Sequence, residues 1–220
     1  MMDSAKYNMR NRALKAFVVP LYWLLRLLFG DPTRELLNSG LLTIGKHTYG
    51  MPRILSYEGD SKVVIGNYSS IAVDVVCIPG GIHPPDWVST YPFRIIRHLP
   101  GISKDMARKS KGDIVIGSDV WIGRGATILS GVKIGDGAII AAEALVARNV
   151  PAYSVFGGNP GELLYYRFPE DRIRKLRAIC WWNWDDAQVD EAINLLSSSN
   201  IDEFIARYHR PDGTDTPTDI

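Results

Sequence analysis

Aliphatic residues recur every six positions along the middle of the chain. The longest unbroken series begins at Ile116 and continues through Ile122, Ile128, Ile134, Ile140 and Val146, and shorter stretches begin at Ile44, Ile65 and Ile71. A period of six conflicts with the 3.6-residue repeat of a helix. It fits a short strand followed by a corner, with side chains pointing alternately inward and outward. Three such units make one triangular turn, so the pattern predicts a stacked coil of strands around a column of isoleucines.

The second and fifth positions of the repeat also hold restricted residue types. The second position is glycine or alanine in all units but one: Gly45, Gly66, Ala72, Gly117, Gly123, Leu129, Gly135, Ala141 and Ala147. We therefore predict a tight turn there. The fifth position holds small or β-branched residues, such as Ser69, Val120 and Ala138, which suit an inward-facing strand site.

The register is interrupted at residues 50–64 and 77–113, and the second interruption is long enough to suggest a functional loop. After Pro151 the hexads stop. Residues 169–178 and 185–196 are typical of helices, and residues 200–208 are a third candidate. We thus predict a helical extension over 1–43, a coil domain over 44–160 with loop 77–113, C-terminal helices over 161–210 and a loose tail over 211–220.

The N-terminal segment has a basic stretch followed by the apolar run 16–29, which superficially resembles a signal peptide. Arg26 interrupts the run, no small-residue cleavage site follows, and the run is shorter than the roughly 20 apolar residues of a transmembrane helix. We expect a helix packed on the domain or on a partner subunit. Peripheral contact of residues 13–30 with the inner face of a membrane is the alternative.

Composition narrows the function classes. The chain has 220 residues, 46% of them hydrophobic, and its 25 basic and 24 acidic residues give a net charge of +1. With so small a net charge, the protein as a whole has no electrostatic attraction for nucleic acid. Cys77 and Cys180 lack the spacing of zinc ligands, so we expect no metal and interpret both as reduced, buried thiols of a cytoplasmic protein.

Four motifs resemble one known family. They are His83-Pro-Pro-Asp-Trp-Val-Ser-Thr-Tyr-Pro-Phe93, Gly112-Asp-Ile-Val-Ile-Gly-Ser-Asp-Val-Trp-Ile-Gly123, Gly157-Gly-Asn-Pro160 and Trp181-Trp-Asn-Trp-Asp185. Over residues 44–205 the chain resembles the xenobiotic acetyltransferase branch of the hexapeptide-repeat acyltransferases, which includes type B chloramphenicol and streptogramin acetyltransferases. The resemblance implies a mainly β fold, a left-handed parallel β-helix with a protruding loop and terminal helices. It also implies acetyl-CoA as donor and a homotrimer with sites between subunits.

The resemblance makes His83 the general base that deprotonates an acceptor hydroxyl. An imidazole with an unperturbed pKa of about 6.5 is neutral at cellular pH and can accept that proton. The alternative is an ordinary loop histidine. Close relatives usually carry Asn directly before this histidine, whereas Ile82 stands here.

For acetyl-CoA, the family binds pantetheine in a groove between neighbouring coils. The matching positions are Trp121, Arg124, Ala142, Ala147 and Arg148. Arg148 could contact a CoA phosphate or be a solvated surface charge. Many relatives have Ala and a basic residue after the Gly-Asn-Pro element, where this chain has Gly161 and Glu162. A phosphate contact at that place is therefore open.

The acceptor is the least constrained part of the prediction. Trp87, Tyr91 and Phe93 could form an acceptor wall or simply anchor the loop. Drug-modifying relatives carry a longer, tyrosine-rich insertion where residues 50–64 lie, and they usually lack an apolar N-terminal extension. We therefore favour a carbohydrate or cell-surface glycan precursor, with chloramphenicol or a streptogramin as the alternative.

Two other classes remain as rivals. A zinc enzyme of the γ-carbonic anhydrase type needs three converging histidines, but the four histidines here are scattered at 47, 83, 98 and 209. A non-catalytic β-helix that serves as an assembly or binding scaffold would not require the long loop that contains His83. Trp181, Trp182 and Trp184 are interpreted as packing residues rather than as a binding box.

Overall fold

A computed structural model describes residues 36–56, 61–106 and 110–210. The chain divides into two units, Met1–Leu41 and Leu42–Ile220. The described part of the first unit contains a short helical turn at residues 36–38. The expected N-terminal helix, including residues 13–30, and the tail 211–220 lie outside the described residues.

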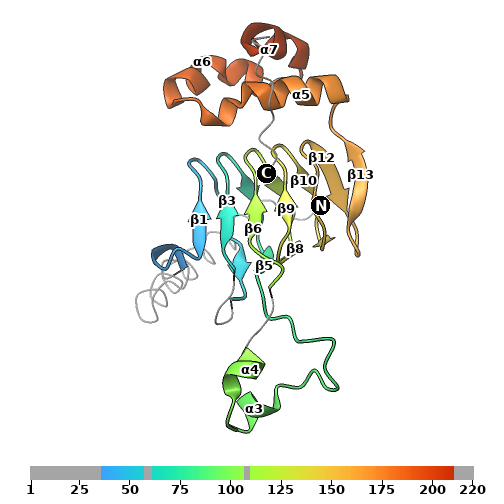
Figure 1. Cartoon of the computed structure of the whole chain (residues 1–220). Coiled ribbons are helices and arrows are strands. Elements are labelled where there is room, and N and C mark those ends of the chain that lie inside the picture. Colours follow the sequence, from blue (N-terminus) through green and yellow to red (C-terminus); the bar gives the residue numbers. More distant parts are fainter. Residues whose placement is uncertain (1–35, 57–60, 107–109, 211–220) are drawn as a thin grey trace, which may run out of the picture. The chain divides into compact units, whose positions relative to one another are not determined.

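The second unit is built mainly from three β-sheets (Figure 1). The first sheet contains β1 (Leu42–Ile44), β3 (Val63–Ile65), β6 (Ile114–Ile116) and β9 (Lys133–Ile134). The second contains β4 (Ser70–Ile71), β7 (Trp121–Ile122), β10 (Ile139–Ile140), β12 (Ser154–Gly157) and β13 (Glu162–Tyr166). The third contains β2 (Arg53–Ile54), β5 (Val76–Ile78), β8 (Thr127–Leu129) and β11 (Leu145–Val146). Every pairing is parallel except that of β12 with β13.

From β3 to β11 the chain visits the first, second and third sheets in rotation, so each strand pairs with the strand one turn later. This confirms the parallel, stacked arrangement that the six-residue period predicted. We call the connection from the first sheet to the second the first corner. The connection from the second sheet to the third is the second corner, and that from the third back to the first is the third corner.

The interior is a column of residues from the first and fifth positions of the repeat. Ile116, Ile122, Ile128, Ile134, Ile140 and Val146 are each at most 1% exposed. Fifth-position residues such as Ser69, Val120 and Ala138 are buried as well. Burial of a side chain of this size contributes about 1.5–3 kcal/mol, so the column is the main stabilising element of the coil.

The glycines of the second position have a different role from the predicted one. The left-handed backbone that makes the turn lies at the fourth position, for example at Asp119, Gly125 and Glu143. At the second position, a Cβ on Gly117 or Gly123 would lie 2.6 Å from an atom of the next coil. Glycine is therefore needed there because adjacent coils approach closely, and the prediction of a tight turn at this position was wrong.

Two predicted boundaries also need correction. Cys77 does not begin the loop, because it lies in β5, pairs with Ile128 and is fully buried. The hexads also continue after Pro151, since β12 pairs in parallel with β10 and buries Phe156. The chain then folds back as β13, the antiparallel edge strand. Strand β12 was missed in the sequence because its segment Ser-Val-Phe-Gly places Phe156, rather than an aliphatic residue, in the column.

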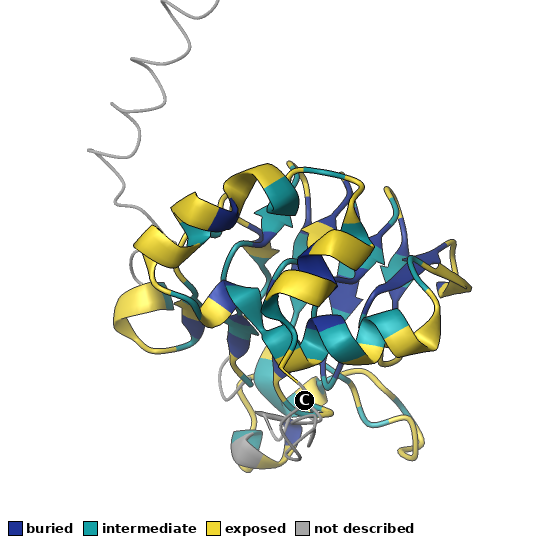
Figure 2. Cartoon of the chain, turned by 90° about the horizontal axis from the view of Figure 1, so that it is seen from above, coloured by how far each residue is buried: buried dark blue, intermediate teal, exposed yellow. Residues whose placement is uncertain are grey.

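The expected C-terminal helices are present as α5 (Glu170–Ile179), α6 (Asp186–Leu196) and α7 (Ile201–Tyr208), with a 3-10 turn η1 (Trp181–Asn183) after α5. The side chain of Asp185 caps α6 by accepting from the Gln188 N–H at 2.8 Å. Figure 2, which looks down on these helices, shows that their outer faces are mostly exposed.

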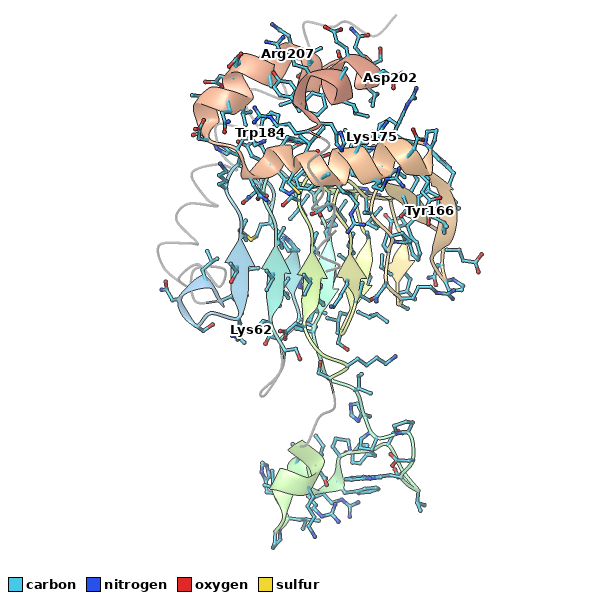
Figure 3. The ribbon with its side chains drawn as sticks, turned by 45° about the horizontal axis from the view of Figure 1, so that its top comes forward. Lys62, Tyr166, Lys175, Trp184, Asp202 and Arg207 are labelled. Atoms are coloured by element: carbon cyan, nitrogen blue, oxygen red, sulfur yellow. The ribbon has the colours of Figure 1, made fainter. Side chains whose placement is uncertain are left out.

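The helices cover the first corner of the coil. Lys46 and Asn67 from that corner donate hydrogen bonds to the carbonyls of Trp184 and Trp182. The apolar contact is the cluster of Tyr153, Leu176, Trp182, Phe204 and Ile205. Trp182 is part of this cluster, and Trp181 and Trp184 (Figure 3) pack against it, as expected of packing residues.

Candidate active site

The loop that carries His83 leaves the coil at the third corner, between β5 and β6 (Figure 1). Its two ends are joined because the Ser110 hydroxyl donates to the Pro79 carbonyl at 2.6 Å. The loop contains two short helices, α3 (Phe93–Ile96) and α4 (Ile102–Met106).

The His83 ring is held in one tautomer. Its Nδ1 lies 2.7 Å from the Thr90 carbonyl oxygen. Because a carbonyl only accepts hydrogen bonds, Nδ1 must carry the proton, and Nε2 then has the free lone pair. His83 is exposed, so Nε2 is available to a reactant. The arrangement suits a general base.

An ion pair between a buried carboxylate, that of Asp105, and the partly exposed guanidinium of Arg94 stabilises the loop near His83. Asp105 accepts from the Arg94 backbone N–H at 2.7 Å and from its guanidinium at 2.6 Å. Burial alone would raise the pKa of the Asp105 carboxyl, but the bonds and charge of Arg94 hold it below its usual range. Asp105 lines the same small pocket as His83. No sequence pattern pointed to this pair, because the two residues lie on separate short helices of the loop, α3 and α4.

The predicted acceptor-binding residues lie in and next to this pocket. Trp87 and Tyr91 line the pocket together with His83 and Ile82. Phe93 lies just outside, with its ring centroid 4.8 Å from that of Tyr91 in an edge arrangement. Trp87, Tyr91 and Phe93 are all partly exposed, so the loop presents an aromatic surface next to the imidazole.

The predicted cofactor residues do not gather in one place on a single chain. Arg124 and Ala142 lie at the second corner, where Arg124 is 3.3 Å from Glu143 and 3.8 Å from Asp74. Trp121 lies on β7 and is 55% exposed.

The other two predicted cofactor residues, Ala147 and Arg148, lie at the third corner after β11, and both are exposed. The third corner is also where the His83 loop is rooted. Within the described part of the chain, Arg148 has no ion pair.

The remaining histidines and cysteines lie elsewhere. His47 bonds Asp186 at 2.9 Å and stacks on Tyr68. Among the described residues no group of three His, Cys, Asp or Glu side chains is placed to hold a metal ion. Cys77 is buried, which raises its thiol pKa to about 12, whereas Cys180 is only half-buried. No helix in the described ranges has the length and apolar character needed to cross a membrane.

A second polar group, Asp119 with Arg167 at the first corner, was not predicted from the sequence. Burial raises the pKa of Asp119 to about 6, although Arg167 at 3.7 Å acts in the opposite direction. From the sequence, Asp119 was only one polar turn residue among several. Its partner is more than forty positions away along the chain, so no local pattern connects them.

Residues 113–148 match the family of bacterial transferase hexapeptides (six repeats). A chloramphenicol acetyltransferase from Escherichia coli is 41% identical over 150 residues, which cover 67% of this chain and 71% of that protein. A probable macrolide acetyltransferase from Lysinibacillus sphaericus is 39% identical over 163 residues, which cover 71% and 88%. The solved structure of a hexapeptide-repeat acetyltransferase from Vibrio cholerae, complexed with acetyl coenzyme A, is 27% identical with a TM-score of 0.46 and covers 59% of this chain and 62% of that one.

Proposed function

This chain belongs to the xenobiotic acetyltransferase branch of the hexapeptide-repeat acetyltransferases, and on that premise we propose that it transfers an acetyl group from acetyl-CoA to a hydroxyl of a small molecule, with His83 as general base. The observation that carries the proposal is the bond from Nδ1 of His83 to the Thr90 carbonyl, which leaves Nε2 free to accept a proton.

In the proposed reaction the acetyl group is transferred directly from the sulfur of acetyl-CoA to the acceptor oxygen. Nε2 of His83 takes the proton of the acceptor hydroxyl while the oxygen attacks the thioester carbonyl. The tetrahedral intermediate then collapses, the C–S bond breaks, and the sulfur leaves with the proton from the imidazolium. The products are an acetyl ester and CoA. Because a thioester is already activated, a positioned base suffices and no acyl-enzyme is needed.

Acetyl-CoA would lie in a groove that two copies of the chain complete. The candidate contacts at the second corner, Arg124 and Ala142, lie on a different edge of the coil from the root of the His83 loop. A trimer of left-handed coils brings the loop of one copy against the corner of its neighbour. In that assembly Trp121 would line the thioester end, and Ala142 and Ala147 would leave the backbone open to pantetheine. We place this assembly in the cytoplasm.

We propose a carbohydrate or glycan precursor as acceptor, on the grounds that the connection 50–64 is short and the N-terminal extension is apolar. Chloramphenicol or a streptogramin is the second candidate. It is favoured by the 41% identity to a protein named chloramphenicol acetyltransferase and by the aromatic surface of Trp87, Tyr91 and Phe93 beside the imidazole.

An acceptor panel tests both levels of the proposal. Purified full-length protein is incubated with acetyl-CoA, and release of free thiol is followed with sugars, sugar nucleotides, chloramphenicol and a streptogramin as acceptors. An analogue of chloramphenicol with fluorine in place of the reacting hydroxyl is the matched control. We expect thiol release and an ester product with a sugar acceptor. Turnover of the drugs alone would favour the second candidate, and no turnover with any acceptor would favour a non-catalytic scaffold.

A further inference from the structure

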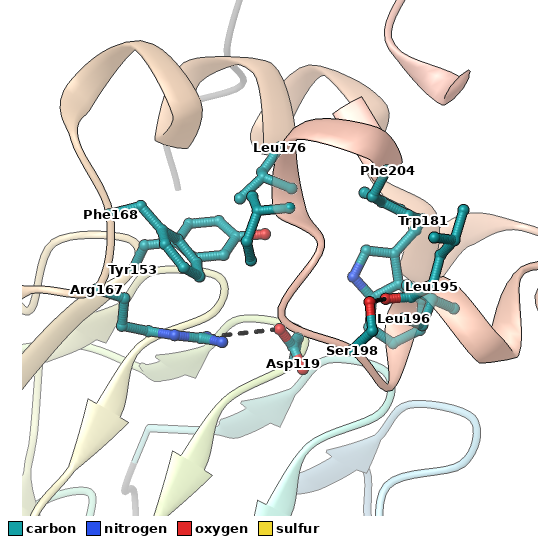
Figure 4. Close-up of a pocket in the computed structure, with 11 residues that line it drawn as sticks. Asp119, Tyr153, Arg167, Phe168, Leu176, Trp181, Leu195, Leu196, Ser198 and Phe204 are labelled. Atoms are coloured by element: carbon teal, nitrogen blue, oxygen red, sulfur yellow. Dashed lines mark hydrogen bonds and ion pairs between the residues drawn. The ribbon is translucent and has the colours of Figure 1, made fainter. Parts of the chain in front are cut away.

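A pocket of about 130 Å³ lies at the first corner, between the coil and the C-terminal helices (Figure 4). Cavities of about 150 Å³ are known to hold a benzene ring, so this space suits one small ring. Apolar side chains of the helices line one part of it, namely Leu176, Leu195, Leu196, Ile201 and Phe204, whereas most of the surface exposed in the pocket is polar. None of the residues assigned above to acetyl transfer lines it.

Several polar groups converge on this pocket and face its apolar part. Arg167 and Asp119 face each other at 3.7 Å at the floor of the pocket. Figure 4 shows the hydroxyl of Tyr153 and the indole nitrogen of Trp181 turned toward the interior. Among the described residues neither group has a hydrogen-bond partner, whereas the nearby Ser198 hydroxyl already donates to the Leu195 carbonyl.

The Arg167 guanidinium is fixed in position. It donates to the Gly137 carbonyl at 2.6 Å and lies 5.2 and 5.3 Å from the ring centroids of Tyr153 and Phe168. A guanidinium has five N–H donors in a rigid fork, so hydrogen-bonding capacity remains beyond the contact with Gly137. The cation therefore stays in place whether or not Asp119 is ionised.

The charges around the pocket make Asp119 the group that can change state. Its ionised form is disfavoured by burial and by Asp136, and favoured by Arg167. Arg177 and Cys180 are the other titratable groups that act on this region, through Asp136 and Tyr153. The pocket thus offers three donors, from Arg167, Tyr153 and Trp181, against one carboxylate that gains a proton readily.

We propose that this pocket is a second ligand site, which binds a small carboxylate on an apolar ring and takes up one proton at Asp119 as it does so. The ligand carboxylate replaces that of Asp119 opposite Arg167 and accepts from the Tyr153 hydroxyl and the Trp181 indole. The ring packs against the leucines and Phe204. With Asp119 neutral, the net charge of the pocket is the same before and after binding, so no unpaired charge is buried.

Benzoate is the probe for this site. Calorimetric titration of the full-length protein at pH 7, repeated in buffers of different ionisation enthalpy, measures the protons taken up per ligand. We expect nearly one proton per benzoate, and an affinity that falls about tenfold for each pH unit above the pKa of Asp119. Benzamide and benzylamine, which have the same ring without the anion, are expected to bind at least about tenfold more weakly.

Three variants separate a designed site from a general apolar cavity. Asp119→Asn should bind benzoate with no proton uptake and with an affinity independent of pH. Arg167→Met should lose binding at least about tenfold. Arg172→Met, on α5 but paired with Asp202 away from the pocket, should bind like the parent protein. Thermal unfolding of each variant checks that the helices remain docked.

Three results would overturn the proposal: no saturable binding of benzoate up to about 10 mM, binding without proton uptake at pH 7, or tighter binding of benzylamine. The last of these would assign the pocket to a cation that pairs with Asp119. Because the measured quantities are affinity and proton uptake rather than turnover, the outcome is independent of acetyl transfer.

Discussion

Replacing Gly135 with alanine tests how closely the coils stack. Gly135 is at the second position of its hexad and has an ordinary backbone conformation, so alanine causes no strain within the residue itself. The added Cβ would lie 2.6 Å from the amide nitrogen of Ala152 in the next coil. Ordinary van der Waals contact begins near 3.4 Å. The two coils must therefore separate locally by about 0.8 Å in a close-packed interior.

The size of the effect follows from the contacts that this separation breaks. The hydrogen bond from the Gly135 N–H to the Val150 carbonyl is 2.9 Å long. A shift of about 0.8 Å would stretch it beyond bonding distance, at a cost of about 1 kcal/mol. Overpacking adds about 1–3 kcal/mol. We therefore expect Gly135→Ala to lower the free energy of unfolding by about 2–4 kcal/mol.

The matched control is a substitution to glycine at the fourth position of a hexad. Glu143 has φ of 60°, a conformation that costs a non-glycine residue about 1–2 kcal/mol. Glycine removes that cost but adds freedom to the unfolded chain, so Glu143→Gly should lie between unchanged stability and a gain of about 1 kcal/mol. Both variants are unfolded with guanidinium chloride at the same protein concentration, so that any effect of self-association on stability is equal in the two. Wild-type stability of Gly135→Ala, or marked destabilisation by Glu143→Gly, would refute the account of the two positions.

Ile140 and Ile139 are neighbours on β10 that point to opposite faces. Ile140→Ala loses three buried carbons and should be about 2–5 kcal/mol less stable, whereas Ile139→Ala should lose about 1 kcal/mol or less. Equal losses in denaturant titrations would argue against the inward-facing column of isoleucines. The pKa of Asp119 is raised from its ordinary value to about 6, so the folded state binds more protons than the unfolded chain between pH 4 and pH 6, and stability falls as pH rises through that window. Asp119→Asn should remove this fall and raise stability at pH 7. We expect a gain of about 1–2 kcal/mol, because solvent screens a side chain that is 32% exposed. An unchanged pH profile of stability would exclude the Asp119 carboxyl as the source of the fall. Asp105→Asn removes the charge that holds Arg94, so we expect limited trypsin digestion to cut the loop 79–110 faster than in the parent, and equal rates would show that the pair does not order the loop.

Much of the coil could be predicted because its core depends on one local rule. An isoleucine at the first position is buried wherever the six-residue register holds, and this fixed the strands from β6 to β11. The rule failed where burial is achieved by other residue types. Cys77 and Phe156 fill the column without being aliphatic, so the start of the loop and strand β12 were misplaced.

The candidate site was predictable only as far as the resemblance reached. It identified His83, but the features that orient the loop are contacts between residues with no sequence pattern, such as His83 with Thr90 and Arg94 with Asp105. The pocket at Asp119 could not be foreseen at all. It exists because α5, α6 and α7 dock on the first corner, and that docking depends on the tertiary packing of Tyr153, Leu176 and Phe204.

If the imidazole of His83 removes the acceptor proton, its loss must slow the chemical step. Steady-state kinetics of His83→Ala are compared with those of His98→Ala, a second histidine of the same loop, with acetyl-CoA and an active acceptor. We expect kcat to fall by about 10²–10⁴-fold for His83→Ala, with KM for acetyl-CoA nearly unchanged, and His98→Ala to behave like the parent. Full turnover by His83→Ala would exclude His83 as the general base.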